Sequence, residues 1–285
     1  MSSSANKLAI GTVQFGLDYG VTNNSGKVQI KEVRSILEFA KNNDINVLDT
    51  AARYGNSEEV LGSADVGDFQ VITKTTPLKN DVNEVIDNFY KSLKNLNKDQ
   101  VYGLLVHDVG DIDNEQFDLL YRKIIELKQQ GLVSKIGFST YTPEQVDFLL
   151  KNFDFDLIQV PFNVFDNRLI QGGQLKALNN KGIEIHARSV FLQGILLDFN
   201  NIPCYFSTWK KEFNDYQEVV KDRGLSLIEY ALNYALNVEE IDKVLVGVNS
   251  KEQLIDIVNA AQKQATTNAF TINNLDLLNP SRWKV

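Results

Sequence analysis

Short apolar runs typical of β-strands alternate along the chain with stretches whose apolar residues recur at helical spacing. The predicted strands cover residues 8–10, 45–48, 71–73, 101–106, 133–138, 157–160, 183–187 and 244–246. The predicted helices cover residues 30–42, 57–62, 82–93, 117–127, 169–179, 225–236 and 251–261, and a further helix begins after Thr142. A long connection without a predicted element runs from Ser189 to about Asp222. Regular alternation of strands and helices predicts a parallel sheet.

About eight strand–helix pairs in 285 residues favour one closed barrel over a doubly wound sheet. We therefore expect an α/β fold of the (β/α)8 TIM-barrel type, as a single domain over residues 1–285 with residues 1–6 frayed. No linker of biased composition divides the chain. A dinucleotide-binding doubly wound fold is the weaker alternative, because no G-x-G-x-x-G motif follows the first strand, and Gly11 and Gly16 have the wrong spacing.

Composition and charge narrow the class of protein. Hydrophobic residues make up 43% of the chain and charged residues 23%, as in a globular protein with a sizeable core. The net charge of −8 argues against a nucleic-acid partner, since such proteins are usually basic. Because Cys204 is the single cysteine and no apolar run suits a signal segment or a membrane span, we expect a cytoplasmic protein without a membrane partner. Cys204, two histidines and scattered acids lack the spacing of metal ligands, so no metal is expected.

Polar side chains follow several of the predicted strands at the point where each strand ends. Asp49, Lys74, His107 and Ser139 occupy such positions, and Tyr54 lies in the loop after Asp49. The carboxyl ends of barrel strands meet at one rim, where barrel enzymes place their reacting groups. Together, an Asp, a Tyr, a Lys and a His can transfer a proton near neutral pH. His186 also lies near a strand end, and we expect it to be a packing or supporting residue.

Several segments, in order along the chain, resemble the aldo/keto reductase family. The resemblance rests on Gly11-Thr12, Asp49-Thr-Ala-Ala-Arg-Tyr-Gly55, Lys74, His107, Gly137-Phe-Ser139 and Gln159-Val-Pro-Phe-Asn163. It extends from about Leu8 to about Ala260. It implies the same barrel fold, and an enzyme that transfers a hydride between a nicotinamide cofactor and a small-molecule carbonyl or alcohol.

The resemblance also implies a role for each catalytic candidate. Tyr54 would be the general acid that protonates the carbonyl oxygen, and Lys74 would lower its pKa by placing a cation beside the phenol. Asp49 would pair with Lys74 and hold it, while His107 would donate to the substrate oxygen or assist the proton transfer. The predicted catalytic residues are thus Asp49, Tyr54, Lys74 and His107. The predicted substrate contacts are Tyr54, His107, Phe15, Tyr19 and Asn163.

The cofactor segments follow the family less closely. The predicted cofactor contacts are Gly11, Thr12, Asp49, Ser139, Thr140, Gln159, Arg188, Ser189, Gly247, Asn249, Ser250, Lys251 and Gln253. Thr140 stands where relatives have Asn, and Arg188 where they present an aromatic ring under the nicotinamide. Asn249 stands where many relatives have a cation that clamps the 2′-phosphate of NADPH, although Lys251 is a possible substitute. The cofactor is therefore expected to be NADP or NAD, with NADPH slightly favoured on family grounds.

The substrate pocket is expected to form from loops at the rim. Besides the residues already given, its candidate residues are Leu17, Phe162, Phe165, Phe191, Phe206 and Trp209. The segment Phe15-Gly-Leu-Asp-Tyr-Gly20 resembles relatives linked to bacterial surface-polysaccharide or sugar metabolism, which suggests a sugar or sugar-derived carbonyl. Two other functions stay open: a nucleotide-binding regulatory barrel without turnover, and a cofactor-free lyase or isomerase that forms an imine on Lys74. The sequence leaves the oligomeric state open.

Overall fold

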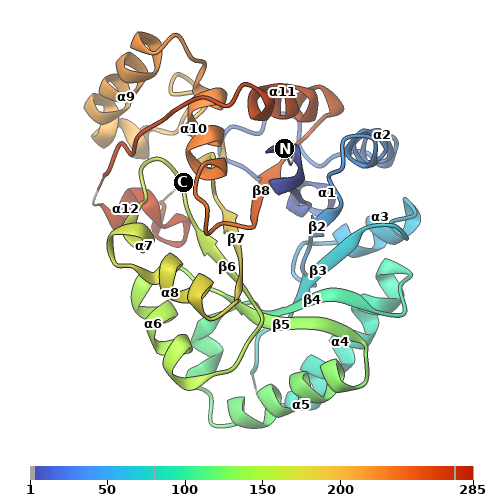
Figure 1. Ribbon diagram of the computed structural model, residues 1–285. Helices are drawn as coiled ribbons and strands as arrows, with labels where there is room; N and C mark the ends of the chain where they lie inside the picture. Colours follow the sequence, from blue (N-terminus) through green and yellow to red (C-terminus); the bar gives the residue numbers. More distant parts are fainter. Residues whose placement is uncertain (1–3, 80, 273, 285) are drawn as a thin grey trace.

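Eight parallel strands close into a barrel in which each strand pairs with its neighbours in the sequence and the first pairs with the last. The computed structural model describes residues 4–79, 81–272 and 274–284. The strands are β1 (Leu8–Gly11), β2 (Val47–Asp49), β3 (Gln70–Lys74), β4 (Val101–Val106), β5 (Val133–Ser139), β6 (Leu157–Pro161), β7 (Glu184–Arg188) and β8 (Lys243–Gly247). Figure 1 shows them at the centre of the molecule with the helices outside. The predicted (β/α)8 barrel is confirmed.

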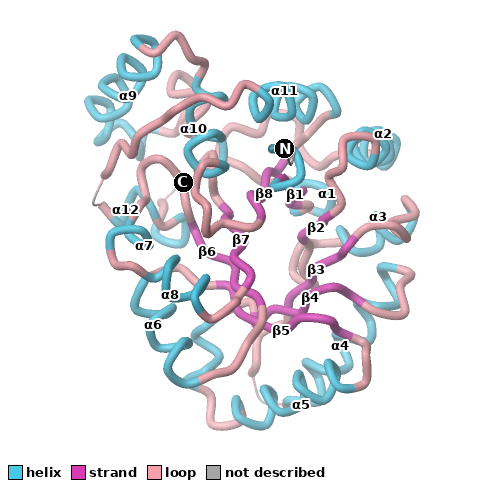
Figure 2. The backbone as a smooth tube through the Cα atoms, viewed as in Figure 1, coloured by secondary structure: helices cyan, strands magenta, loops and turns pink. Residues whose placement is uncertain are grey.

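Helices surround the barrel, as the cyan ring around the magenta strands in Figure 2 shows. Those of the repeating units include α2 (Ile30–Lys41), α3 (Ser57–Ser63), α4 (Val82–Leu96), α5 (Phe117–Gln129), α6 (Pro143–Asn152), α8 (Gln174–Asn180), α10 (Leu227–Leu236) and α11 (Lys251–Gln262). The remaining helices are α1 (Val13–Gly16), α7 (Arg168–Gln171), α9 (Lys210–Asp222) and α12 (Leu275–Leu278). None of the described helices is long and apolar enough to cross a membrane.

Alternation along each strand divides the core into two clusters. Successive side chains of a strand point to opposite faces, so one set points into the barrel and the other toward the helices. The inner cluster consists of Ala9, Val47, Ile72, Leu105, Leu157 and Leu245. The larger outer cluster packs strands against helices and includes Leu48, Val71 and Leu104. A residue two places beyond an inner residue therefore points inward again, one layer closer to the carboxyl end of its strand.

A cluster of polar side chains occupies the opposite, amino-terminal end of the barrel interior. The carboxylate of Glu184 accepts hydrogen bonds from Lys135 and from the Tyr102 hydroxyl, the latter at 2.6 Å. His186 is fully buried, and its Nε2 lies 2.5 Å from Glu184 Oε1. His186 is thus a supporting residue of this group, which we name the lower cluster: Tyr102, Lys135, Glu184 and His186.

Two expectations from the sequence were wrong. The long connection after Ser189 contains α9, whose residues Phe213, Tyr216 and Val220 are buried. The helix expected over residues 169–179 is two helices, α7 and α8, because Gly173 has a φ of 80° between them. At the amino terminus, Ser4–Lys7 form a short 3-10 helix and residues 1–3 lie outside the described residues, so the fraying of residues 1–6 stays a prediction.

Candidate active site

The inner positions of the barrel place three polar side chains in one layer at its carboxyl end. Asp49 is two residues after Val47, Lys74 two after Ile72, and Gln159 two after Leu157. Each of these apolar residues belongs to the inner cluster. The two-residue period of a strand therefore aims the three polar side chains inward, immediately beyond the apolar layer.

Asp49 and Lys74 form a buried ion pair. The Lys74 Nζ lies 2.8 Å from Asp49 Oδ1 and 2.7 Å from Oδ2, and it donates to the Thr50 carbonyl oxygen at 2.8 Å. Gln159 Nε2 donates to Asp49 Oδ1 at 2.7 Å. The exposed fraction is 1% for Lys74 and 3% for Asp49. Because a buried charge needs both a partner and hydrogen bonds, this geometry fixes the ammonium group in one position.

Tyr54 and His107 lie beside this pair. The Tyr54 hydroxyl is 3.5 Å from Lys74 Nζ, which also lies 5.0 Å from the centroid of the Tyr54 ring. The rings of Tyr54 and His107 meet edge to face, with centroids 5.8 Å apart and an interplanar angle of 83°. The structure thus brings all four predicted catalytic residues together at the carboxyl end of the barrel.

The pKa of Tyr54 differs from the sequence-based expectation in its direction. Burial raises the pKa of this phenol above its usual range, and the negative charge of Asp49 raises it further. The nearby Arg188 and Arg53 act in the opposite direction but do not outweigh burial. The pKa of Tyr54 is thus raised rather than lowered, although the ammonium group of Lys74 lies beside the phenol. Tyr54 therefore keeps its proton at neutral pH.

His107 is neutral at physiological pH. Burial lowers its pKa to about 3, and the positive charges of Lys74, Arg53 and Arg188 act in the same direction. Its Nδ1 is buried and has no hydrogen-bond partner among the described residues. A neutral imidazole carries one N–H donor and one acceptor, so His107 can serve a ligand oxygen without adding charge to the site.

A cavity of about 650 Å³ opens at this end of the barrel. A volume of this size suits a small-molecule or cofactor site. The predicted site residues that line it are Gly11, Thr12, Tyr19, Asp49, Tyr54, His107, Ser139, Gln159, Arg188, Ser189, Gly247, Asn249 and Gln253. Leu17 and Phe191, from the wider set of pocket candidates, also line it.

Several predicted substrate contacts do not line the cavity. Phe15 is fully buried in the outer cluster. Asn163 is 1% exposed, and its Oδ1 accepts hydrogen bonds from the backbone N–H groups of Phe165 and Asp166, so it stabilises a turn. The remaining buried aromatic candidates are core residues: Phe162, Phe165, Phe206 and Trp209.

Three predicted cofactor contacts also lie outside the cavity lining. Thr140 is fully buried below it. The Ser250 hydroxyl caps α11 by accepting from the Gln253 backbone N–H at 3.3 Å. Lys251 Nζ lies 5.9 Å from the centroid of the Phe39 ring, on the outside of the barrel. Lys251, the candidate to replace the missing clamp of the 2′-phosphate, is therefore directed toward α2.

The structure also adds residues that the sequence interpretation missed. Gln14, Arg53, Tyr141 and Gln193 line the cavity. Arg53 and Tyr141 adjoin motif residues that were identified, so nearness to a motif was an available signal.

Arg188 Cζ lies 4.4 Å from the Tyr141 ring centroid, and Arg188 donates to the Thr140 carbonyl oxygen at 2.8 Å. This stacked pair presents a flat cationic surface where relatives present an aromatic ring.

Two unpaired acceptors fit the donors of a nicotinamide nucleotide. Gln14 Oε1 and Asn249 Oδ1 are buried and have no partner among the described residues, and both side chains line the cavity. Buried acceptors are normally satisfied, so these two are suited to the amino or hydroxyl groups of a bound ligand. The cavity thus fits an NAD(P) cofactor both in its volume and in the hydrogen-bond acceptors that it offers.

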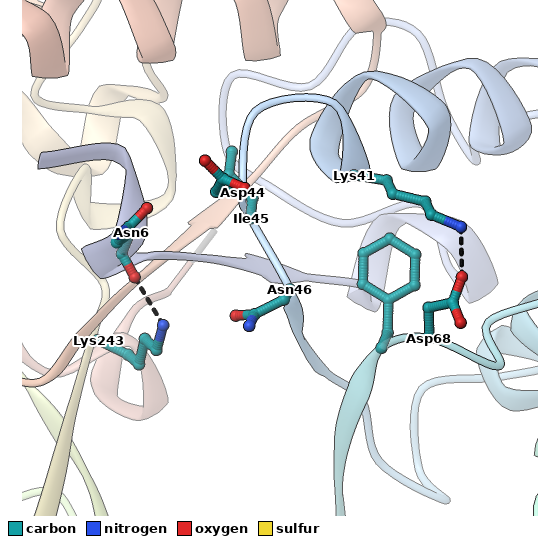
Figure 3. A pocket seen from close by; sticks show the side chains of 8 residues that line it. Asn6, Lys41, Asp44, Ile45, Asn46, Asp68 and Lys243 are labelled. Carbon is teal, nitrogen blue, oxygen red and sulfur yellow. Dashed lines mark hydrogen bonds and ion pairs between the residues drawn. The ribbon is translucent and has the colours of Figure 1, made fainter. Parts of the chain in front are cut away.

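A second hollow, of about 570 Å³, lies at the amino-terminal end of the barrel (Figure 3). Its lining includes Asn6, Asn46, Phe69 and Lys243, which precede or begin strands. Lys243 Nζ donates to the Asn6 carbonyl oxygen at 2.6 Å, and Lys41 pairs with Asp68 at the rim. Because the side chains at this end hold loops and strand starts together, it is a stabilising end of the barrel rather than a reactive one.

Comparisons with known proteins identify the family to which this barrel belongs. The sequence model of the Aldo/keto reductase family matches residues 7–274. The chain belongs to this family. It is accordingly an NAD(P)-dependent oxidoreductase.

The relatives include several named oxidoreductases. The chain is 27% identical over 265 residues to an uncharacterized oxidoreductase, YqkF, from Bacillus subtilis, covering 82% of this chain and 83% of the relative. It is 24% identical over 251 residues to L-glyceraldehyde 3-phosphate reductase from Escherichia coli, covering 78% and 67%. An aldo-keto reductase from Bacillus halodurans, solved in its holo form, has the same fold, with a TM-score of 0.72 at 23% identity and coverage of 92% and 87%.

Proposed function

We propose that this protein reduces an aldehyde or a ketone to an alcohol, with Tyr54 as the proton donor and NADPH or NADH as the cofactor. The bound cofactor supplies a hydride to the carbonyl carbon. Negative charge then develops on the carbonyl oxygen, which requires a donor already in position. The chain supplies that donor at the cavity surface.

The observation that carries the proposal is the environment of the Tyr54 hydroxyl. It faces the cavity, retains its proton because of burial, and lies 3.5 Å from Lys74 Nζ. As the proton leaves, the ammonium group of Lys74 stabilises the phenolate, and Asp49 holds that group in place. Neutral His107, whose ring contacts that of Tyr54 edge to face, offers a second hydrogen bond to the substrate oxygen.

The remaining cavity walls suit the cofactor. Ser139 and Gln159 lie beside one another on β5 and β6 and would hold the carboxamide of the nicotinamide. The Arg188–Tyr141 pair would support the ring, and Gln14 and Asn249 would accept hydrogen bonds from the nucleotide. No residue of this group needs to move a proton.

The substrate that we propose is a sugar-derived carbonyl. Two relatives carry sugar-related names, L-glyceraldehyde 3-phosphate reductase and the L-galactose dehydrogenase of Arabidopsis thaliana, which is 26% identical over 239 residues. Polar groups such as Tyr19, Asn23 and Gln193 line the cavity and would bind hydroxyls.

Replacing Tyr54 with Phe tests the proposed role directly. Tyr54→Phe removes the proton donor and little else, so kcat for aldehyde reduction should fall about 10²- to 10⁴-fold. The dissociation constant for NADPH, measured by quenching of protein fluorescence, should stay within about twofold of the wild-type value, or well under 1 kcal/mol. Tyr90→Phe is the matched control, because Tyr90 is 45% exposed on α4. Its kcat should match that of the wild type.

Three results would contradict the proposal. Wild-type turnover by Tyr54→Phe would exclude Tyr54 as the acid. Saturable cofactor binding without turnover of any carbonyl would instead favour a regulatory barrel. Borohydride trapping of an imine on Lys74 would favour a lyase, although Lys74 is buried, forms three short hydrogen bonds and does not line the cavity.

A further inference from the structure

The charges of the cavity differ in sign from those of the whole protein. The net charge of the chain is −8, yet Arg53 and Arg188 both line the cavity. Among its described lining residues the carboxylates are Asp49 and Asp256, and Asp49 is already paired with Lys74. An acidic protein that keeps two guanidinium groups around its site creates a local attraction for anions.

The two arginines lie on different walls and have different partners. Arg188, at the end of β7, donates to the Thr140 carbonyl oxygen and stacks on Tyr141, on the side where the cofactor is proposed to lie. Arg53 lies in the turn between β2 and α3, next to Tyr54 in sequence. In the described part of the chain, Arg53 forms no hydrogen bond or ion pair.

Electrostatic influence places Arg53 beside the proton-handling groups. Its positive charge acts on both Tyr54 and His107: it opposes the rise in the pKa of Tyr54 and adds to the lowering of the pKa of His107. It also acts on Asp111, whose pKa burial raises, although the two side chains form no ion pair. Arg53 is therefore a cation next to the reacting end of the cavity whose hydrogen-bonding capacity is available to a ligand.

We propose that Arg53 recognises an anionic group on the carbonyl substrate, either a carboxylate or a phosphate. Guanidinium groups bind both anions through paired, charge-assisted hydrogen bonds. A substrate whose carbonyl oxygen meets Tyr54 would present its anionic group to Arg53 because the two residues are consecutive in one turn. This inference rests on the proposed reductase function and adds the charge class of the substrate.

Matched pairs of aldehydes test this inference. The carboxylate pair is succinic semialdehyde and butanal, and the phosphate pair is glyceraldehyde 3-phosphate and glyceraldehyde. For at least one pair, the wild-type kcat/KM should favour the charged member by about 10- to 100-fold, the range expected for a hydrogen bond to a charged group. The pair that shows the preference identifies the anion. The preference should weaken with added salt, since salt screens exposed charges.

Variants of Arg53 separate recognition from general damage. Arg53→Gln should bring the charged-to-neutral ratio close to one, mainly through a higher KM for the charged member, and Arg53→Lys should restore part of it. Arg122→Gln is the matched control, because Arg122 is an exposed arginine on the outer helix α5, and its ratio should equal that of the wild type.

The outcomes distinguish this inference from the function on which it rests. Turnover of the neutral aldehydes with ratios near one for both pairs would overturn the role of Arg53 and leave the reductase function standing. A preference that survives Arg53→Gln would overturn it in the same way. Failure to reduce any of the four aldehydes with either cofactor would overturn the reductase function and this inference together.

Discussion

Asp49 combines two tasks that can be measured separately. It fixes the ammonium group of Lys74 beside Tyr54, the proposed proton donor, and it provides the charge that makes burial of that group tolerable. The pair is almost fully buried, whereas the ion pair of Lys41 with Asp68 lies in solvent. The contrast between these two pairs separates the effect of burial from that of pairing.

Removing the charge of Asp49 should therefore destabilise the fold. Asp49→Asn leaves a buried ammonium group without an anion, and we expect the free energy of unfolding in urea to fall by about 3–5 kcal/mol. The double variant Asp49→Asn with Lys74→Met should recover part of this loss. The control Asp68→Asn should change stability little, because its pair is exposed. Equal effects at the two sites would show that burial does not set the strength of the inner pair.

The uncharged side chain of Asn249 leads to a prediction about cofactor choice. Arg53 and Arg188 are the basic residues among the described lining of the cavity, and Lys251 is directed toward α2. Without a clamp for the 2′-phosphate, the dissociation constants for NADPH and NADH should differ by less than about a hundredfold, or 2.7 kcal/mol. Asn249→Arg should shift the preference toward NADPH. Fluorescence titration of both proteins with both cofactors measures this, and a stronger wild-type preference for NADPH would contradict it.

At the scale of single residues, the sequence predicted that the four proposed catalytic residues lie together but not how they titrate. Strand ends and motif spacing placed Asp49, Lys74 and His107 at one rim, because backbone period and barrel topology decide their positions. The pKa of Tyr54 depends instead on burial and on the negative charge of Asp49. Burial also determines the position of Phe15, whose side chain lies in the core. Neither property can be obtained from spacing.

At the scale of elements, the helices with clear signals were predicted best. Thr142 and Gln145 form the capping box that starts α6, with Pro143 in its first turn. Helix α9 has an apolar face of comparable spacing, but no side chain caps its start at Trp209. The absence of that start signal explains why the segment was taken as a connection.

The approach of β5 to β6 yields a prediction at the same scale. A Cβ added to Gly137 would lie 1.6 Å from the Leu157 carbonyl oxygen, so the two strands can pair closely only with glycine there. Gly137→Ala should lower the free energy of unfolding by about 3 kcal/mol or more. It should also weaken cofactor binding, because Ser139 and Gln159 follow on the same strands. In exposed Gly67→Ala, where the nearest atom is 3.4 Å away, stability should stay within about 0.5 kcal/mol. Similar stabilities of the two variants would argue against a close strand contact.

At the scale of the whole molecule, the two ends of the barrel have different tasks. The cavity and the proposed catalytic residues lie at the carboxyl end, while the lower cluster fills the interior near the other end. Burial alone would raise the pKa of Glu184, but hydrogen bonds from His186, Lys135 and Tyr102 outweigh it and lower the pKa to about 2. The side chain of Glu184 is 12% exposed, so solvent screens this interaction little.

Acid should therefore weaken the fold through Glu184. Because its folded pKa lies below the usual 4.5, its contribution is complete above pH 4.5 and is lost as the pH falls toward 2. The full contribution is up to about 3 kcal/mol. In urea unfolding, the difference between the wild type and Glu184→Gln should be largest near pH 6 and shrink steadily toward pH 3. A difference that does not change with pH would rule out this linkage.

Because β1 pairs with β8, the barrel is closed, and its first and second halves both contribute residues to the site. Asp49, Tyr54, Lys74 and His107 belong to the half that ends with β4 and its following loop, whereas Ser139, Gln159, Arg188 and Asn249 belong to the half that begins with β5. The proposed proton donor and most of the proposed nucleotide contacts are thus encoded in separate stretches of the gene. A chimaera that joins residues 1–131 to the second half of another family member would exchange nucleotide preference while keeping the proton donor. The two halves, expressed as separate fragments, would regain reductase activity only when they associate.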